Sequence, residues 1–262
     1  MNIYISVDLE GISGTYEPAQ MREGVRYEEA RRYMTWDINA CVEGCKAAGA
    51  NKIIVRDSHA GGSNVIWGEL SPHIDRIITG RSAPDKRMVH IEECEAVILL
   101  GYHAMAGTRG GVLEHIWSSA AWQNLWINGK PAGEIALDAA IAGEYGVPVI
   151  MVSGDDYACA EARALLPGVV TAEVKQGLSV SGASMLVKEK AHALIRAKAE
   201  EAVKKAGQIK PYKVEIPIKM RLELVSRGVV PSRYAKPYME IIDGRTYEVT
   251  GSTVEEALFR LN

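Results

Sequence analysis

The chain has 262 residues, of which 47% are hydrophobic, and a formal net charge of -3 at pH 7. A chain of this length can bury a sizeable core, either in one large domain or in a main domain with a smaller one. Its slightly acidic balance gives no basic surface for nucleic acid or for an anionic membrane, so neither is expected as a partner. The composition favours a small-molecule or peptide substrate.

Neither a targeting signal nor a membrane span is predicted. The first ten residues lack the basic region and apolar stretch of a signal peptide, and no apolar run approaches the ~20 residues that span a bilayer. We therefore expect a cytoplasmic location. The cysteines form no CxxC pair, which predicts buried thiols rather than a thiolate metal site or a disulfide framework. They are Cys41, Cys45, Cys94 and Cys159.

The first half of the sequence alternates strand and helix patterns, which is typical of an α/β fold. Residues 2–7 are a short β-rich run, and residues 27–48 carry apolar residues at helical spacing until Gly49. Residues 52–55 (KIIV) and the continuous apolar run at 96–100 (AVILL) predict buried strands.

The next elements begin with a predicted hairpin. Residues 125–127 indicate a strand, and Asn128-Gly129 after it is a strong signal for a tight turn. A helix is predicted over 133–145 and a further strand over 147–152.

From about Thr171 the pattern changes. An amphipathic helix runs from Val187 to Ala202, a proline-bearing β-rich segment follows, and a capping box at residues 253–256 begins a final short helix. We therefore divide the chain into an α/β domain with the candidate site, residues 1–170, and a smaller α+β portion, residues 171–262, packed closely against it.

Three predicted strands end at residues that can bind a metal. Asp8 and Glu10 follow the first strand, His59 follows the run at 52–55, and His103 follows the run at 96–100. In open α/β sheets, sites form beyond the carboxyl ends of the strands, so these side chains are expected to meet. Imidazole nitrogen and carboxylate oxygen are ligands that zinc accepts in catalytic sites.

Each residue also has an ordinary explanation. Asp8 and Glu10 face the same side of an extended segment, where a cation would remove their repulsion, but acidic residues are also common at solvated strand ends. A lone histidine is more often a hydrogen-bonded surface or core residue than a ligand. Glu134 stands in the first turn of a predicted helix, where the helix dipole favours glutamate without a further role.

His115 follows a glycine-bearing loop rather than a strand. On spacing alone it is a surface or core histidine. Near metal ions, however, an unligated imidazole suits proton transfer or stabilisation of a tetrahedral intermediate, which makes His115 the candidate catalytic residue. Asp155 and Asp156, after the strand at 147–152, are candidate partners for a substrate's amino terminus, or else ordinary solvated strand-end residues.

The segment from Ile5 to Gly14 (ISVDLEGISG) resembles the SxDxEGxSG signature of the D-aminopeptidase family of dinuclear zinc peptidases. Further blocks continue the resemblance in family order as far as Gln176. They are RDSH at 56–59, GYHA at 101–104, INGKPAGE at 127–134, VSGDD at 152–156 and VKQ at 174–176.

The resemblance implies a role for each matched residue. Asp8 would bridge two zinc ions, and His115 would take the place of the family's catalytic histidine. The two coordination shells would be completed by Glu10, His59, His103 and Glu134. The implied fold is a three-layer α/β/α unit with a mostly parallel sheet and a smaller C-terminal α+β portion. The implied activity is release of the N-terminal residue from short peptides, including D-amino-acid peptides, by a homo-oligomer that in the family is a ten-subunit ring.

The chain departs from the family pattern at residues 60–64 and 118–121. Both stretches are expected to line the substrate pocket, so a preference for D- over L-residues does not follow from the resemblance.

In the expected mechanism, two zinc ions about 3.5–4 Å apart activate a water and polarise the scissile carbonyl. His115 would donate a proton or stabilise the oxyanion, since no covalent step is required. Two-metal sites also serve phosphate esters, so a phosphoesterase is an alternative, although the sequence has no P-loop. A further alternative is a catalytically silent peptide-binding subunit with structural zinc, which a ligand set without cysteine does not favour.

Overall fold

The computed structural model describes residues 1–81, 86–231 and 236–261. Its larger sheet has seven strands in the order β3-β2-β1-β4-β7-β8-β9. All neighbouring strands pair in parallel except β9, which runs antiparallel to β8 at the edge. The strands are β1 (Asn2–Val7), β2 (Lys52–Asp57), β3 (Arg76–Ile78), β4 (Ala96–Leu100), β7 (Val149–Asp155), β8 (Val170–Ser179) and β9 (Gly182–Met185).

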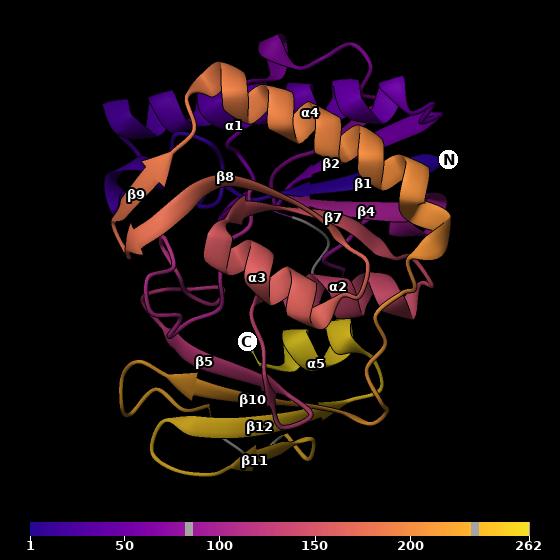
Figure 1. The fold of residues 1–262 in the computed structure, drawn as a ribbon. Coiled ribbons are helices and arrows are strands. Elements are labelled where there is room, and N and C mark those ends of the chain that lie inside the picture. The colour runs from indigo at the N-terminus through magenta and orange to yellow at the C-terminus, as the bar shows by residue number, and fades with distance from the viewer. Residues whose placement is uncertain (82–85, 232–235, 262) are drawn as a thin grey trace.

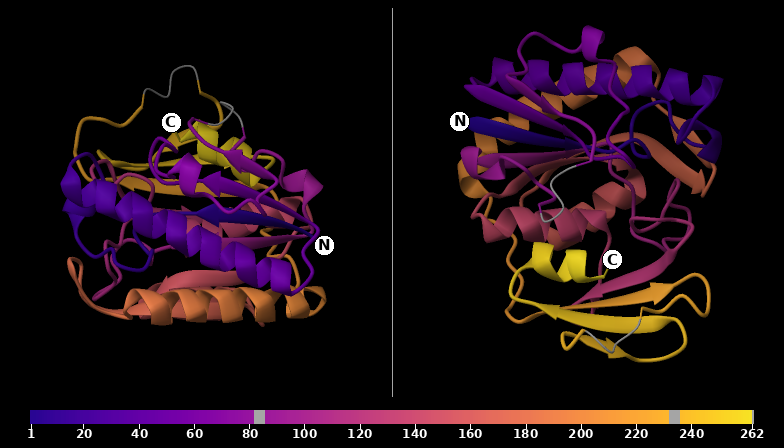
Figure 2. Two further views of the ribbon diagram at one scale, coloured as in Figure 1. Left: turned by 90° about the horizontal axis from the view of Figure 1, so that it is seen from above. Right: turned by 180° about the vertical axis from the view of Figure 1, so that it is seen from behind.

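Helices cover both faces of this sheet (Figures 1 and 2). The helices α1 (Val25–Ala47) and α4 (Lys188–Lys205) lie together on one face, and α2 (Glu134–Glu144) and α3 (Asp156–Leu165) lie on the other. Short 3-10 helices occur at Pro18–Gln20, Trp67–Glu69, Ile91–Glu93 and Ala206–Gln208. The predicted α/β/α layering with a mostly parallel sheet is confirmed.

A smaller sheet is antiparallel and has the order β11-β12-β10-β5-β6. Its strands are β5 (Trp122–Ile127), β6 (Lys130–Pro131), β10 (Ile218–Leu224), β11 (Met239–Ile241) and β12 (Thr246–Gly251), followed by α5 (Val254–Arg260). Asn128 and Gly129 join β5 to β6 with φ angles of 48° and 77°. Both angles lie in the left-handed region that a tight hairpin turn of this kind requires, as the sequence predicts.

The two sheets do not divide at residue 170, because each contains segments from both sides of the predicted boundary. Strand β8 begins at that residue, and β9 and helix α4 follow it, yet all three pack with the larger sheet. Strands β5 and β6 precede it but belong to the smaller sheet. The middle of the chain thus contributes two strands to the sheet that the last third completes.

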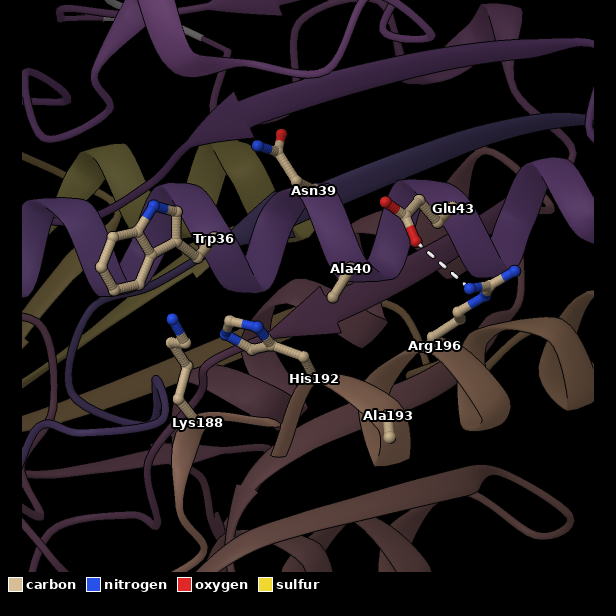
Figure 3. Close-up of a pocket in the computed structure, with 8 residues that line it drawn as sticks. All are labelled: Trp36, Asn39, Ala40, Glu43, Lys188, His192, Ala193 and Arg196. Carbon is tan, nitrogen blue, oxygen red and sulfur yellow. Dashed lines mark ion pairs between the residues drawn. The ribbon is translucent and has the colours of Figure 1, made fainter. Parts of the chain in front are cut away.

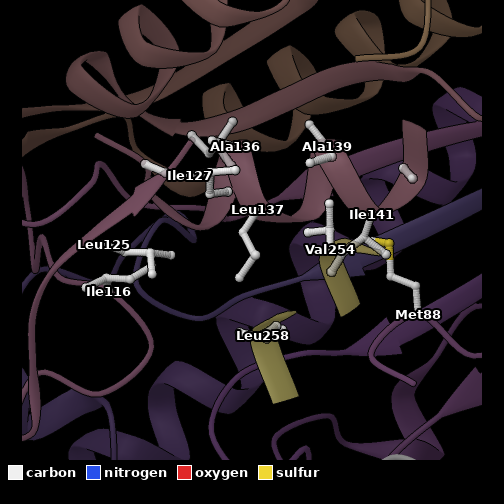
Figure 4. Packing of buried hydrophobic residues seen from close by; sticks show 14 of the residues in the cluster. Met88, Ile116, Leu125, Ile127, Ala136, Leu137, Ala139, Ile141, Val254 and Leu258 are labelled. Atoms are coloured by element: carbon white, nitrogen blue, oxygen red, sulfur yellow. The ribbon is translucent and has the colours of Figure 1, made fainter. Parts of the chain in front are cut away.

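Helix α2 lies at the centre of the molecule, between the larger sheet and the smaller sheet with α5 (Figures 1 and 4). Every residue from Glu134 to Gly143 is buried, as expected of a helix that is apolar on nearly all sides. Leu137 and Ile141 pack in one cluster with Val254 and Leu258 of α5. Because Glu134 begins this buried helix, its carboxylate has a fixed place beside the larger sheet.

Among the described helices, none is both long enough and apolar enough to cross a bilayer. All four cysteines are buried and free, as predicted.

Candidate metal centre

The register of the larger sheet brings three strand ends together. Val7, the last residue of β1, pairs with Asp57 of β2 and with Leu100 of β4. The residues that follow therefore leave the sheet at one edge. Gly101 allows a close approach of two strand ends there, since its φ is 72° and a Cβ atom would lie 2.5 Å from the Asp8 carbonyl oxygen.

All five predicted ligands meet at this edge. Nδ1 of His59 lies 3.2 Å from Asp8 Oδ1 and 3.0 Å from Glu10 Oε2. On the other side of Asp8, Nε2 of His103 lies 3.4 Å from Asp8 Oδ2 and 3.4 Å from Glu134 Oε1. Asp8 thus stands between two groups of ligand atoms, one with each histidine.

Backbone carbonyl groups fix the rotation of the histidine rings. His59 is bonded through Nε2 to the Met21 oxygen at 3.1 Å, and His103 through Nδ1 to the Ala104 oxygen at 2.9 Å. When either ring is neutral, the nitrogen bonded to the carbonyl is the N–H donor, so the other nitrogen presents its lone pair to the site. Such a backbone hydrogen bond commonly orients a histidine that binds metal.

His103 Nε2 gives the clearest sign that the donors fit a metal. The atom is buried and has no hydrogen-bond partner in the described chain, although two carboxylate oxygens lie 3.4 Å away. Ligands at zinc bond lengths of ~2.0–2.2 Å in a tetrahedral arrangement are separated by roughly 3.4 Å. The nitrogen and oxygen donors therefore have the spacing and the chemistry that a zinc ion requires.

The electrostatics of the site call for positive charge. Burial alone would raise the pKa of Glu134, but the His103 ring lowers it to about 2. Burial would likewise lower the pKa of His103, but Glu134 and then Asp8 raise it to about 10. The same holds for Glu10 and His59. Burial would raise the pKa of Glu10, but His59 holds it well below its usual range. Burial would lower the pKa of His59, but Glu10 and Asp8 raise it. Divalent cations would supply the charge that protons on these rings otherwise provide.

His115, the candidate catalytic residue, lies against the same group. Its ring stacks on that of His103 with centroids 4.1 Å apart, and Nδ1 is 2.9 Å from the Leu113 carbonyl oxygen. Nε2 lies 4.0 Å from Glu10 Oε1 and 3.9 Å from Glu134 Oε1, farther than the other two histidines are from their carboxylates. Its side chain is 16% exposed, whereas that of His103 is fully buried.

A cavity of about 600 Å³ opens above these residues, a size typical of small-molecule sites. It is lined at its floor by the side chains of Asp8, Glu10, His59, His115 and Glu134. Its apolar walls are Pro18, Met21, Leu113, Trp117 and Val180, and its polar walls include Arg22, Arg87, Glu114, Ser118 and Ser119.

The cavity walls include unusual backbone conformations. Ala60, Leu113 and Trp117 have φ angles of 46°, 54° and 55°, in the left-handed region that residues other than glycine rarely adopt. Such conformations gather at functional sites, where the surrounding structure compensates for their strain. Ala60 and Ser118 also belong to the stretches where the sequence departs from the family pattern.

Several supporting residues escape the sequence analysis. Arg87 lines the cavity, contacts Glu134 and pairs with Asp138, four residues farther along α2. Lys175 is buried beneath the loop of Asp8 and Glu10, where Nζ donates to the Glu10 carbonyl at 2.6 Å and to the Thr15 carbonyl at 2.6 Å. Of these residues, only Lys175 could have been noticed in the sequence, because it lies within the VKQ block at 174–176 that resembles the family.

Asp155 and Asp156 use their carboxylates within the fold. Asp155 accepts the backbone N–H groups of Ala158 and Val112, both at 2.7 Å, and so caps α3. Asp156 accepts the N–H group of Gly177 at 2.8 Å. Neither is among the residues that line the cavity, so the structure gives no support to a role at the substrate's amino terminus.

A second hollow of about 380 Å³ lies between α1 and α4 (Figure 3). Trp36, Lys188 and His192 line one end, and an ion pair between Glu43 and Arg196 lies at the other. None of the predicted metal ligands lines it.

Known proteins resemble this chain over nearly its whole length. The D-aminopeptidase family matches residues 1–262. A D-aminopeptidase of Bacillus subtilis (strain 168) is 35% identical over 248 residues, which cover 94% of this chain and 89% of that protein. A solved structure matches with a TM-score of 0.93 and 33% identity, over 100% of this chain and 95% of the other. That structure is the Zn-dependent D-aminopeptidase DppA from Bacillus subtilis, described as a self-compartmentalizing protease. The resemblance inferred from the sequence is confirmed: the chain belongs to the D-aminopeptidase family of peptidases.

Proposed function

We propose that this protein is a dinuclear zinc aminopeptidase that releases the N-terminal residue of short peptides. The observation that carries the proposal is the meeting of Asp8, Glu10, His59 and Glu134 on the floor of one cavity, with His103 directly beneath them. Nε2 of His103 is buried and has no hydrogen-bond partner in the described chain. The zinc dependence of the similar solved structure supports the choice of metal.

Two ions suit the donor set better than one. The ligand atoms fall into two groups on either side of Asp8, so this carboxylate can serve both ions. Two divalent cations exceed the charge of the three carboxylates by one unit. The site would then favour an anionic nucleophile and an anionic transition state.

The chain's own residues divide the remaining tasks. When bound, a zinc pair polarises a carbonyl and lowers the pKa of water. Asp8, Glu10, His59, His103 and Glu134 would bind the pair. His115 presents Nε2 to the cavity, where it would donate a proton to the leaving amine or a hydrogen bond to the oxyanion. The walls formed by Leu113, Trp117 and Val180 would contact the substrate's side chain and exclude water.

Release of D-residues forms part of the proposal, supported by the D-aminopeptidase relatives. The test is hydrolysis of paired L- and D-aminoacyl p-nitroanilides and dipeptides by the zinc-reconstituted protein, beside p-nitrophenyl phosphate. We expect release of D-residues, loss of activity with EDTA, no activity on N-acetylated peptides and none on the phosphate. Preferential hydrolysis of the phosphate would instead identify a phosphoesterase, and a zinc-loaded protein inert on every peptide would indicate a silent subunit.

The proposal includes a homo-oligomer, a ten-subunit ring. Its support is the self-compartmentalizing relative, together with exposed apolar side chains on the β8–β9 hairpin and the segment after it. These side chains are Leu178, Val180, Met185, Leu186 and Val187. A cytoplasmic location agrees with four cysteines that are free and buried.

A further inference from the structure

Arg87 is a buried cation at the edge of the metal-binding cavity. Its side chain is only 8% exposed, and its guanidinium carbon lies 4.5 Å from the centre of the Trp117 ring. It lines the cavity together with Trp117 and Glu134. A charge this far from water is strongly unfavourable unless anionic groups surround it.

Two carboxylates of α2 share the guanidinium group. Nε and Nη2 of Arg87 donate to the two oxygens of Asp138, the second at 2.9 Å, and Nη2 also lies 3.4 Å from Glu134 Oε2. Glu134 and Asp138 are one turn apart on the same helix face, so one arginine reaches both. Asp138 is fully buried and also accepts the Tyr102 hydroxyl, which fixes the pair in place.

The contact with Arg87 separates the roles of the two Glu134 oxygens. Oε2 faces the guanidinium group. Oε1 accepts the Trp117 backbone N–H at 2.8 Å and is the oxygen that lies 3.4 Å from His103 Nε2. The plane of the carboxylate is thus fixed, with Oε1 directed to the metal-binding donors.

The C-terminal helix α5 anchors the backbone of Arg87. Oε1 of Glu255 accepts the N–H groups of Arg87 at 2.7 Å and of Met88 at 3.2 Å, and its Oε2 accepts the Tyr145 hydroxyl at 3.2 Å. Glu255 is itself buried. A continuous set of contacts therefore connects the last helix of the chain to the metal-binding cavity through Arg87.

We propose that Arg87 is a positioning residue that fixes the orientation of Glu134 toward zinc, and that Glu255 of α5 maintains Arg87 in that position. The inference rests on the proposed function, because it assumes that Glu134 binds a metal. Arginine stays protonated at every accessible pH, so the positive charge beside Glu134 does not titrate away. Partners of this kind typically change metal affinity by 10–100-fold.

The first test is zinc affinity, measured by chelator competition on Arg87→Met and Arg87→Lys. We expect Arg87→Met to weaken one of two zinc-binding steps about 10–100-fold and to leave the other unchanged. On zinc-saturated protein, kcat should fall more than KM rises, because a displaced Glu134 affects the reacting centre rather than substrate contacts. Arg87→Lys should recover only part of the loss, since an ammonium lacks the planar fork. The control is Arg76→Met, which removes an exposed arginine paired with Glu93 away from the cavity.

A second pair of variants separates positioning from folding. Arg87→Met alone leaves Asp138 as an unpaired buried charge, whereas Arg87→Met/Asp138→Leu replaces both charges by apolar side chains, a change that folds often tolerate. We expect the double variant to melt like the parent and still bind one zinc weakly. Glu255→Gln retains the side-chain shape and should weaken the binding of the same zinc ion by a smaller factor. If the double variant does not fold, the zinc affinity of Glu255→Gln tests the positioning role instead.

The outcomes distinguish this inference from the function on which it rests. A parent protein that binds no zinc overturns the proposed function. A parent that binds two zinc ions, with folded Arg87 and Glu255 variants of unchanged zinc affinity and kcat, overturns only the role of Arg87.

Discussion

At the scale of single residues, His115 differs from the two histidines beside it. His59 and His103 lie 3.0–3.4 Å from carboxylate oxygens, whereas His115 Nε2 lies 3.9 and 4.0 Å from them and its side chain is partly open to the cavity. An imidazole near the donors, but less closely engaged, is suited to act on substrate.

We therefore expect His115→Ala to lower kcat by about 10²–10⁴-fold, the usual contribution of a positioned acid or base, without changing zinc content. Steady-state kinetics and elemental analysis on the same preparation provide the measurement. Loss of zinc together with activity would show that His115 is a ligand, which would contradict the role given to it here.

At the scale of elements, the strand ends could be predicted because the signal is local. Strand patterns end directly before Asp8, Arg56 and Gly101, and the parallel register that joins β1, β2 and β4 brings the following residues to one edge. Arg87 could not be predicted in this way. It lies in an aperiodic segment before β4, and its importance depends on α2 and α5, which only the folded chain brings to it.

The edge hairpin β8–β9 and the helix α3 were also missing from the sequence prediction. Helix α3 is only ten residues long, four of them alanine, and begins directly after β7 without a turn to mark its start. The hairpin carries Leu178 and Val180 exposed rather than in the core, so its pattern does not indicate a buried strand. The division at residue 170 follows a change in sequence pattern, whereas the sheets are assembled from segments on both sides of it.

Glu161 on α3 gives a prediction about pH. Its Oε2 accepts the Met105 N–H at 2.8 Å, while Oε1 is buried without a partner in the described chain, and burial raises the pKa of this carboxyl to about 7. The unfolded chain ionises Glu161 near pH ~4.3, so folded stability falls as pH rises from there through about 7. Glutamine mimics the protonated carboxyl group of Glu161, so a glutamine at this position avoids the loss of folded stability.

Glu161→Gln should therefore gain stability over the parent between pH 5 and pH 8, by up to about 3 kcal/mol. Urea denaturation of EDTA-treated proteins at several pH values measures the difference, in which the other titrating groups largely cancel. A difference between the two proteins that stays constant across this range would show that Glu161 is already ionised in the folded protein at pH 5.

At the scale of the whole molecule, two sheets enclose α2, and the β8–β9 hairpin extends the larger sheet to an exposed edge (Figure 1). Leu178 is 70% exposed there, and Val187, just beyond the hairpin, is 62% exposed. Exposed apolar side chains beside the edge strand of a sheet are typical of a surface that another chain covers. Val180 of the hairpin turn also lines the cavity, so assembly at this surface would narrow access to the site.

We expect Leu178→Asp to lower the mass of the assembly, because it places a charge in the proposed contact. Light scattering after size-exclusion chromatography measures that mass, and Ile242→Asp, at an exposed apolar position next to β11, is the matched control. An unchanged mass for Leu178→Asp would remove the hairpin from the contact, and a monomeric parent would contradict the oligomer itself.

The most direct measurement is the location of zinc by anomalous diffraction at the zinc absorption edge, on crystals of the reconstituted protein. We expect two peaks, with Asp8 next to both, at bond lengths of ~2.0–2.2 Å. His59 and Glu10 should surround one peak, and His103 and Glu134 the other. A single peak, or zinc bound to other residues with these five side chains left free, would contradict this expectation.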